Sequence, residues 1–193
     1  MNLMDRRRAI RLIAGIGLMG VLLFWLQRKF GFGSKFDASE LRRYKQTIDH
    51  LAETIIPETE TPGAMRAQVG DFIIRMISDC SSPKVQYNFL RGVKQVEDHC
   101  QRKYGRHYAQ CTADDRISVL ERFERNAVSR FAILNKVNNK IFGTPFIVQL
   151  KALTVEGYCT SELGATKALA YDPIPVHYLG CMPLAPGQKT WAI

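Results

Sequence analysis

The chain has 193 residues, of which 46% are hydrophobic and 23% are charged, and this fits one globular domain with a targeting segment. Its formal net charge of +9 first suggests binding to nucleic acid or to a membrane surface. Residues 1–35 carry a net +6 of this, which leaves +3 for residues 36–193. Because the basicity belongs to the N-terminal segment, it argues against nucleic acid as a partner.

A pair of arginines, Arg6 and Arg7, lies directly before an uncharged run from Leu12 to Leu26. A basic start followed by an apolar stretch is typical of export signals. The twin-arginine signal, which directs folded proteins to the periplasm, reads Ser/Thr-Arg-Arg-x-Phe-Leu-Lys; here the segment reads Asp-Arg-Arg-Arg-Ala-Ile-Arg. The arginine pair is intact, whereas Asp5 and Ala9 depart from the pattern. We therefore expect export to the periplasm by the twin-arginine route.

The same segment has an alternative interpretation as a membrane anchor. Its apolar run, as a helix, rises about 22 Å, which is short of a hydrocarbon core of about 30 Å. Arg28 and Lys29 follow the run and could lie at the membrane surface. No Ala-x-Ala cleavage site follows, and the best substitute is Gly31-Phe32-Gly33. Residues 1–33 are thus predicted to be a signal or an anchor, with inner-membrane contact through residues 12–26.

The rest of the chain, residues 34–193, shows helical periodicity and is predicted to form one all-α domain of five or six helices. The first helix begins near Asp37 or Ser39 and ends before Pro57. After a turn at residues 61–63, two more helices follow, and the later one begins at Ser82-Pro83. Their apolar faces are Leu41, Tyr44, Ile48, Leu51 and Ile55; Val69, Phe72, Ile73, Met76 and Ile77; and Leu90, Val93, Val96 or Glu97, and Cys100.

Three further helices are predicted in the second half of this domain. Thr112 and Asp115 resemble a capping box at the start of the fourth helix. Thr144-Pro145 begins the sixth. The inward residues are Ile117, Leu120 and Phe123 in the fourth helix, Phe131, Leu134 and Val137 in the fifth, and Phe146, Leu150 and Leu153 in the sixth.

The helical pattern ends near Gly157, and residues 156–193 are predicted to form an irregular, extended tail. The stretch from Tyr171 to Pro175, and Pro183 and Pro186 after it, favour extended chain and turns. Such a tail buries little surface against itself, so it lies either on its own helices or on a partner subunit. The sequence leaves both alternatives open.

Five cysteines in an exported chain suggest disulfides, because the periplasm is oxidising. Cys100 and Cys111 flank a short connection between two helices and form one expected pair. Cys159 and Cys181, which flank the tail, form the other. Cys80 is then left over as a buried apolar residue of the second helix. The alternative, in which all five cysteines are reduced and buried, is also open.

Two histidines and two cysteines lie near one another in the sequence and are of types that bind metals. They are His99, Cys100, His107 and Cys111. Their spacing lacks the tight Cys-x₂-Cys pairs of common zinc sites, and the chain has no Cys-x-x-Cys-His haem attachment. We expect neither a metal nor a haem on this chain.

Motifs for catalysis are missing as well. The chain has no Gly-x-Ser-x-Gly nucleophile elbow, and Ser81 and Ser82 are interpreted as helix-start residues. Glu58, Glu60 and Asp71 are carboxylates near a turn, where such clusters are mostly solvated. The sequence favours a non-catalytic protein, with a stand-alone enzyme of unfamiliar type as an alternative.

Three regions of the chain resemble the gluconate 2-dehydrogenase subunit 3 family. The most specific runs from Leu153 to Gly164 and continues from Ala170 to Pro175. The helix end and turn from Leu51 to Ala64 form the second region, and Arg102-Lys103-Tyr104-Gly105 with the helix after it forms the third. The resemblance covers about residues 38–184.

This resemblance implies a non-catalytic small subunit without a cofactor of its own. Its partner would be a large FAD-containing subunit similar to glucose–methanol–choline oxidoreductases, often joined by a multihaem cytochrome c as a third subunit. The small subunit would carry the export signal for the folded pair and stabilise the large one. Family substrates include gluconate, fructose, glucosides and disaccharides. The residues expected to bind the partner are in the tail: Tyr158, Thr160, Ser161, Glu162, Tyr171, Pro173 and Pro175.

The chain departs from the family pattern at one position. Cys159 occupies a position where the family is expected to have an aromatic residue. The alternative function is a membrane-anchored scaffold whose N-terminal segment is never cleaved.

Overall fold

The computed structural model describes residues 36–127, 144–172 and 186–192, together with residues 17, 20, 174, 181 and 183. The chain divides into two units, Met1–Phe36 and Asp37–Ile193, and the helices considered below belong to the second. The export-signal arginines, the predicted fifth helix, Pro173 and Pro175 lie outside the described residues. Within the described part, no helix combines the length and apolar character that a membrane span requires.

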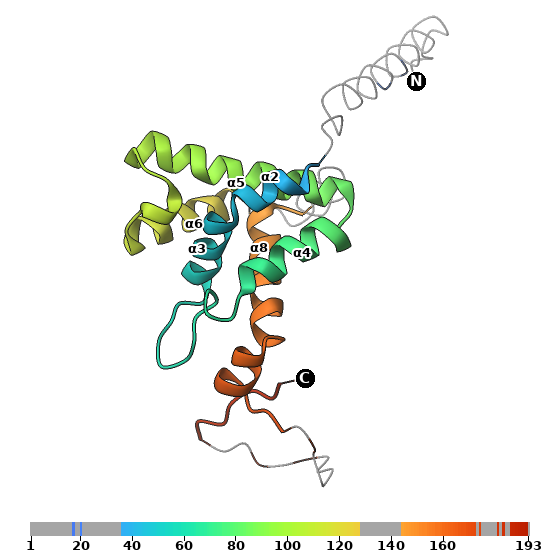
Figure 1. Ribbon diagram of the computed structural model, residues 1–193, viewed down its shortest axis with the longest axis vertical. Helices are drawn as coiled ribbons and strands as arrows, with labels where there is room; N and C mark the ends of the chain where they lie inside the picture. Colours follow the sequence, from blue (N-terminus) through green and yellow to red (C-terminus); the bar gives the residue numbers. More distant parts are fainter. Residues whose placement is uncertain are drawn as a thin grey trace, which may run out of the picture. The chain divides into compact units, whose positions relative to one another are not determined.

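The described part of the second unit is built from helices, as predicted (Figure 1). It has no strand, and one isolated parallel bridge joins Ala170 to Trp191. In chain order the elements are α2 (Ala38–Arg43), α3 (Lys45–Ile55), α4 (Val69–Cys80), α5 (Pro83–Tyr104), the 3-10 helix η1 (Tyr108–Gln110), α6 (Ala113–Ala127), α8 (Phe146–Cys159) and the π-helical turn η2 (Gly164–Ala168).

The first predicted helix is divided in two, which corrects the sequence interpretation. Asp37 caps α2 as expected, because its carboxylate accepts hydrogen bonds from the Ser39 N–H and hydroxyl, both at 2.8 Å. These bonds lower the pKa of Asp37. The helix ends at Tyr44, whose N–H donates to Leu41 O at 3.0 Å in a tightened last turn. A new helix, α3, then begins at Lys45.

Helix α8 is the central helix of this unit and packs against α3, α4, α5 and α6. Its predicted inward residues Phe146, Leu150 and Leu153 are buried. Gly92 of α5 allows the close approach, since a Cβ there would lie 2.2 Å from the Phe146 ring. In Figure 1 the C-terminal end of α8 extends beyond the helices around it. The core helices thus pack around the first half of α8, and its second half leads toward η2 and the tail.

Helix α6 confirms its predicted start but not its whole inward face. The Asp115 N–H donates to Thr112 Oγ1 at 3.3 Å, and the Thr112 hydroxyl donates back to the Asp115 carboxylate at 2.8 Å. Leu120 is buried as predicted, whereas Ile117 is 48% exposed and Val119 takes the inward position. Two residues along a helix are about 200° apart, so Ile117 and Val119 cannot both face inward.

The tail begins later than predicted, and its end turns back on the chain. Helix α8 continues to Cys159 and η2 extends the helical region to Ala168, so residues 156–168 are not irregular. The Ala170 N–H donates to Thr190 O, and the Ala192 N–H donates to Ala170 O, both at 2.8 Å. At least this part of the tail thus lies on its own chain.

Candidate functional site

The loop after α3 is folded around one carboxylate. Glu53 accepts the Glu58 N–H at 2.9 Å on one oxygen and the Met65 N–H at 2.7 Å on the other. Gly63 is needed at this bend, because a Cβ there would meet the Glu53 carboxylate. The loop enters α4 through Gln68, whose φ of 55° is left-handed and uncommon outside glycine. These contacts hold the loop in one position beside α4.

The end of α8 is closed by its own hydroxyl groups. Tyr158 is 6% exposed and donates its hydroxyl to Pro62 O at 2.6 Å, which ties α8 to the loop. The Thr160 and Ser161 hydroxyls both donate to α8 carbonyls at 2.7 Å. A side chain at Gly164 would collide with Tyr158 O, so only glycine fits there. Two of the three regions that carry the family resemblance therefore meet in space through Tyr158 and Pro62.

A groove of about 440 Å³ lies between this loop, α4 and the end of α8, and we call it the α4/α8 groove. Phe72 packs directly on Gly157 within it, because a Cβ on that glycine would lie 2.5 Å from the ring. Glu162 is exposed at its α8 side. The remaining lining residues are Arg66, Ala67, Gln68, Arg75, Thr160, Ser161 and Leu163.

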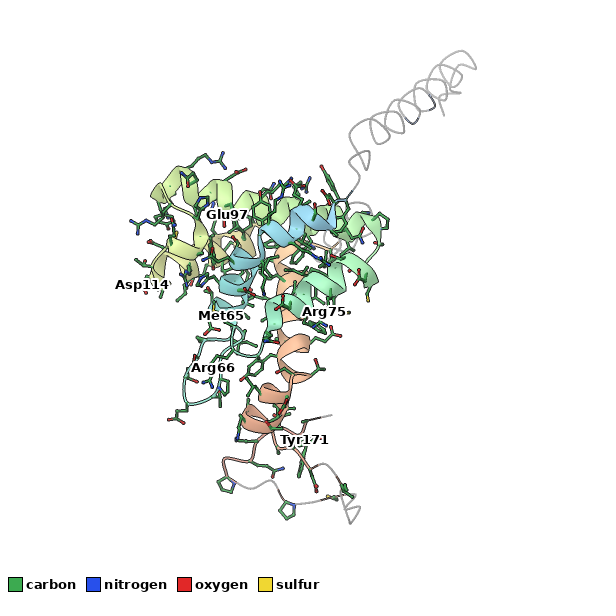
Figure 2. The ribbon with its side chains drawn as sticks, in the orientation of Figure 1. Met65, Arg66, Arg75, Glu97, Asp114 and Tyr171 are labelled. Atoms are coloured by element: carbon green, nitrogen blue, oxygen red, sulfur yellow. The ribbon has the colours of Figure 1, made fainter. Side chains whose placement is uncertain are left out.

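Apolar side chains are exposed just beyond this groove, in the tail. Tyr171 is 55% exposed, Ile174 76% and Trp191 50%. Figure 2 shows Tyr171 beyond the end of α8, and the bridge from Ala170 to Trp191 brings both aromatic residues to the same part of the tail. We call Tyr171, Ile174 and Trp191 the exposed tail residues. Exposed apolar side chains of this size are common on surfaces that a partner covers.

The other end of the unit contains a buried carboxylate that the sequence did not single out. Glu97 of α5 is 9% exposed and accepts a hydrogen bond from the Thr47 hydroxyl of α3. Its second oxygen contacts His107 Nδ1 at 3.1 Å and accepts the Tyr108 N–H at 3.3 Å. The sequence left Val96 and Glu97 as alternatives for the inward face, and both are buried. Glu97 thus joins α3, α5 and η1.

Cys100 and Cys111 lie together beside this carboxylate. Cys100 is fully buried and Cys111 is 4% exposed. Burial, followed by the hydrogen-bonded Cys111 thiol, raises the pKa of Cys100 to about 12. All five cysteines carry free thiols in the structure. Cys80 was predicted to be buried, but it is the last residue of α4 and is exposed there.

The other predicted pair joins Cys159 to Cys181. Cys159 is half-buried at the end of α8, and Cys181 is exposed in the tail. The predicted bond between them stays a prediction.

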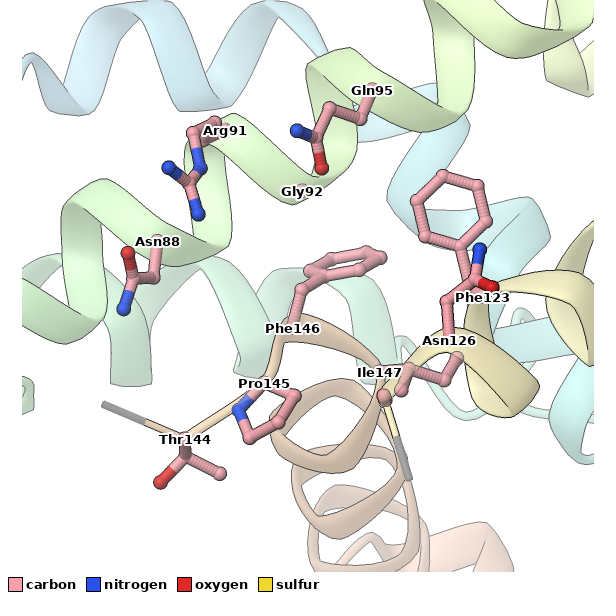
Figure 3. A pocket seen from close by; sticks show the side chains of 11 residues that line it. Asn88, Arg91, Gly92, Gln95, Phe123, Asn126, Thr144, Pro145, Phe146 and Ile147 are labelled. Carbon is pink, nitrogen blue, oxygen red and sulfur yellow. The ribbon is translucent and has the colours of Figure 1, made fainter. Parts of the chain in front are cut away.

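A second cleft, of about 270 Å³, lies where α5 and α6 meet the start of α8 (Figure 3). Phe146 extends toward Gly92 inside it, with Phe123 from α6 alongside. Its polar lining consists of Asn88, Arg91, Gln95, Asn126 and Thr144. None of its described lining residues is an acid, a histidine or a cysteine.

Two of the three carboxylates near the first turn, Glu58 and Asp71, are in separate ion pairs. Glu58 pairs with Arg66 at 2.7 Å, and Asp71 pairs with Lys45 at 2.8 Å, so the two do not converge on one site. Across the described residues, no group of three or more His, Cys, Asp or Glu side chains is arranged to hold a metal ion.

Comparison with known proteins gives one match. The family model described as "Gluconate 2-dehydrogenase subunit 3" matches residues 43–176, which run from the end of α2 into the tail. No curated protein and no solved structure matches the chain.

Proposed function

The chain belongs to the gluconate 2-dehydrogenase subunit 3 family, and we propose that it is the non-catalytic small subunit of a periplasmic, membrane-associated, FAD-dependent sugar or polyol dehydrogenase. The observation that carries this proposal is the family match over residues 43–176, which spans α3 through η2. In this proposal FAD belongs to a large subunit of the glucose–methanol–choline type, and a multihaem cytochrome c can complete the complex as the electron acceptor.

The arrangement of polar and apolar groups supports a binding role. Glu97, Tyr158, Thr160 and Ser161 direct their side chains to the chain's own backbone or to neighbouring side chains. The exposed tail residues, in contrast, leave apolar surface uncovered. Of the tail residues predicted to bind the partner, we therefore assign Tyr171 and Glu162 to the docking surface. Tyr158, Thr160 and Ser161 instead shape the chain that carries it.

Co-expression with the large flavin subunit tests the proposal directly. Purification through a tag on the small subunit should recover a complex with flavin absorbance and sugar oxidation measured with a dye acceptor. The small subunit alone should show neither. Turnover by the small subunit alone, or export of an active flavin subunit in its absence, would overturn the accessory role.

The N-terminal arginines supply a test of the export route. Replacing Arg6 and Arg7 with lysine keeps the charge but removes the pair that the twin-arginine route requires. Both subunits should then accumulate in the cytoplasm. Arg11→Lys, outside the pair, is the matched control and should leave export unchanged. If both subunits still reach the periplasm in the double variant, they use another route.

The uncharged run of residues 12–26 supports a second candidate, a scaffold that stays anchored in the inner membrane. The mass of the mature protein distinguishes the two. A mature protein that begins after Gly33 indicates a cleaved signal, whereas retention of Met1 indicates a permanent anchor. Either result leaves the partnership with the flavin subunit to be tested by co-purification.

For the cysteines we propose a disulfide between Cys100 and Cys111 in the mature protein. The two thiols are buried next to each other, which favours this pair over the others. Bond formation removes two protons and two electrons, which pass to a disulfide-bonded thiol oxidase of the oxidising compartment. The oxidised protein should be lighter by the mass of two hydrogen atoms.

A further inference from the structure

The α4/α8 groove is lined by two arginines that can bind a carboxylate of another molecule. Arg75 is exposed on α4, its Nε–H donates to Asp71 O at 3.4 Å, and it is absent from the ion pairs of the described residues. Arg66 pairs with Glu58, but the two side chains are 60% and 49% exposed. Exposed pairs contribute little net free energy, so another carboxylate can join or replace this one.

The opposite side of the groove offers few free donors. The Thr160 and Ser161 hydroxyls are already bonded to α8 carbonyls at 2.7 Å. Glu162, the charged residue on this side, is an acceptor. An anionic group in the groove is therefore favoured on the arginine side and disfavoured beside Glu162.

The groove is also formed before any ligand arrives. Glu53 holds the loop through two backbone N–H groups, and Tyr158 fixes the end of α8 to the same loop. Phe72, packed on Gly157, gives the groove an aromatic surface between its charged sides. A site that needs no ordering loses little entropy on binding. Its volume of about 440 Å³ suits a few side chains of an extended segment.

Figure 2 shows how the charged residues relate to the rest of this end of the molecule. Met65 and Arg66 lie on the loop before α4, Arg75 lies on α4, and Tyr171 lies beyond the end of α8. Met65 is 39% exposed and adds apolar surface beside Arg66. The groove is lined by the end of α8, and Tyr171 lies just beyond that end, so one partner can cover both.

We propose that the α4/α8 groove receives an extended acidic segment of the large flavin subunit. Carboxylates of that segment pair with Arg75 and with Arg66, and an adjacent apolar side chain packs on Phe72. The inference rests on the proposed function, since it takes its partner from there, and it adds the chemistry by which that partner is recognised.

Charge reversal tests the groove in the co-expressed complex. Arg75→Glu should raise the dissociation constant roughly tenfold or more, and Arg66→Glu somewhat less, because each replaces attraction by repulsion. Arg125→Glu is the matched control: this arginine is exposed on α6 and pairs with Glu121 at 3.4 Å, away from the groove. Arg75→Gln should give an intermediate value. Unchanged thermal unfolding of the isolated variants confirms that folding is intact.

Salt dependence and cross-linking identify the occupant. Raising the salt concentration should weaken the wild-type complex more than the Arg75→Gln complex, since one ion pair has been removed. A photo-cross-linking side chain in place of the exposed Gln68 should capture a peptide of the large subunit that contains Asp or Glu. Capture of a second copy of this chain, or of a large-subunit peptide without an acid, overturns the proposal.

The binding experiments distinguish a failure of the groove proposal from a failure of the proposed function. If wild-type protein fails to co-purify with any flavin subunit, the proposed function fails. If wild type forms the complex and Arg75→Glu binds as tightly as Arg125→Glu does, the function stands and the groove proposal fails.

Discussion

The two ends of the helical unit differ in how far their polar and apolar groups are buried. At the η1 end, Glu97 is buried and bonded to residues of α3 and η1, and two thiols are enclosed beside it. At the far end of α8, two arginines line an open groove and the exposed tail residues keep half or more of their surface uncovered. The polar groups at the η1 end thus find their hydrogen-bond partners within the chain, whereas the α8 end exposes charged and apolar surface to a partner.

This difference suggests a division of labour along α8. Its first half, from Phe146 to Leu153, lies in the core among four other helices. Its second half buries Thr154 and Tyr158, exposes Val155 by 51%, and leads into η2 and the tail, which carries the exposed tail residues. Changes at the η1 end should therefore lower stability and leave the affinity for the partner intact, whereas changes at the α8 end should do the reverse.

The largest effect is expected from Glu97→Ala. It leaves the Tyr108 N–H and the Thr47 hydroxyl without their acceptor inside the protein, which should cost about 3 kcal/mol in the free energy of unfolding. Urea unfolding of the isolated small subunit measures this. The control, Glu121→Ala, removes an exposed ion pair and should cost under about 0.5 kcal/mol. A loss as small as the control's would show that Glu97 does not hold this end together.

The second effect concerns the two enclosed thiols. Closing the short loop between Cys100 and Cys111 should stabilise the folded state by about 2–3 kcal/mol relative to the reduced protein. Unfolding of oxidised and reduced samples gives the difference, and Cys159→Ser is the control that leaves this loop unaffected. A protein that keeps its mass under oxidising conditions would show that burial protects both thiols from oxidation. A bond that forms without added stability would contradict the expected effect of closing the loop.

The positions of most helices and their inward residues could be predicted from the sequence, because they depend on the periodicity of apolar residues. The inward residues of α4, α5 and α8 repeat at helical spacing, and Thr112 and Pro83 mark helix starts in the way their side chains require. The turn before α4 was also predictable from Pro62 and Gly63. Such patterns predict the structure of the segment in which they occur, because they depend only on neighbouring residues.

The remaining features depend on contacts between distant segments, which periodicity does not record. Nothing near Glu97 in sequence indicates that Thr47, fifty residues earlier, will meet it. The break at Tyr44 interrupts an unbroken apolar pattern, and the π-helical turn depends on Ser161 bonding to the chain around it. The α4/α8 groove is likewise formed by residues far apart in the chain.

At the α8 end, the paired substitution Tyr171→Ser and Trp191→Ser should affect binding rather than folding. The side chains are 55% and 50% exposed, so the free energy of unfolding of the isolated subunit should change by less than about 0.5 kcal/mol. The dissociation constant of the complex should rise roughly tenfold, since aromatic side chains dominate many interfaces. Ile117→Ser, at an exposed apolar residue of α6, is the control. If the double variant and the Ile117→Ser control bind the large subunit with the same dissociation constant, the docking surface lies elsewhere.

The smallest effect is a pH dependence of the stability, which arises from His50 in α3. Burial, and then the charge of Arg116, lower the pKa of His50, while Asp49 and Glu53 act in the opposite direction. Its Nδ1 is buried without a hydrogen-bond partner. Because the folded protein binds this proton less readily than the unfolded chain does, stability is complete above the unfolded pKa of about 6.5 and declines as the pH falls below it.

His50→Gln should therefore reduce the slope of unfolding free energy against pH between about pH 5 and 7. His99, whose pKa is also lowered by burial, contributes in the same direction and should account for part of the slope that remains. The exposed tail residues carry no titrating group in this range, so Tyr171→Ser should leave the slope unchanged. A slope of opposite sign, or one that His50→Gln does not alter, would show that the buried ring does not control acid sensitivity at this end.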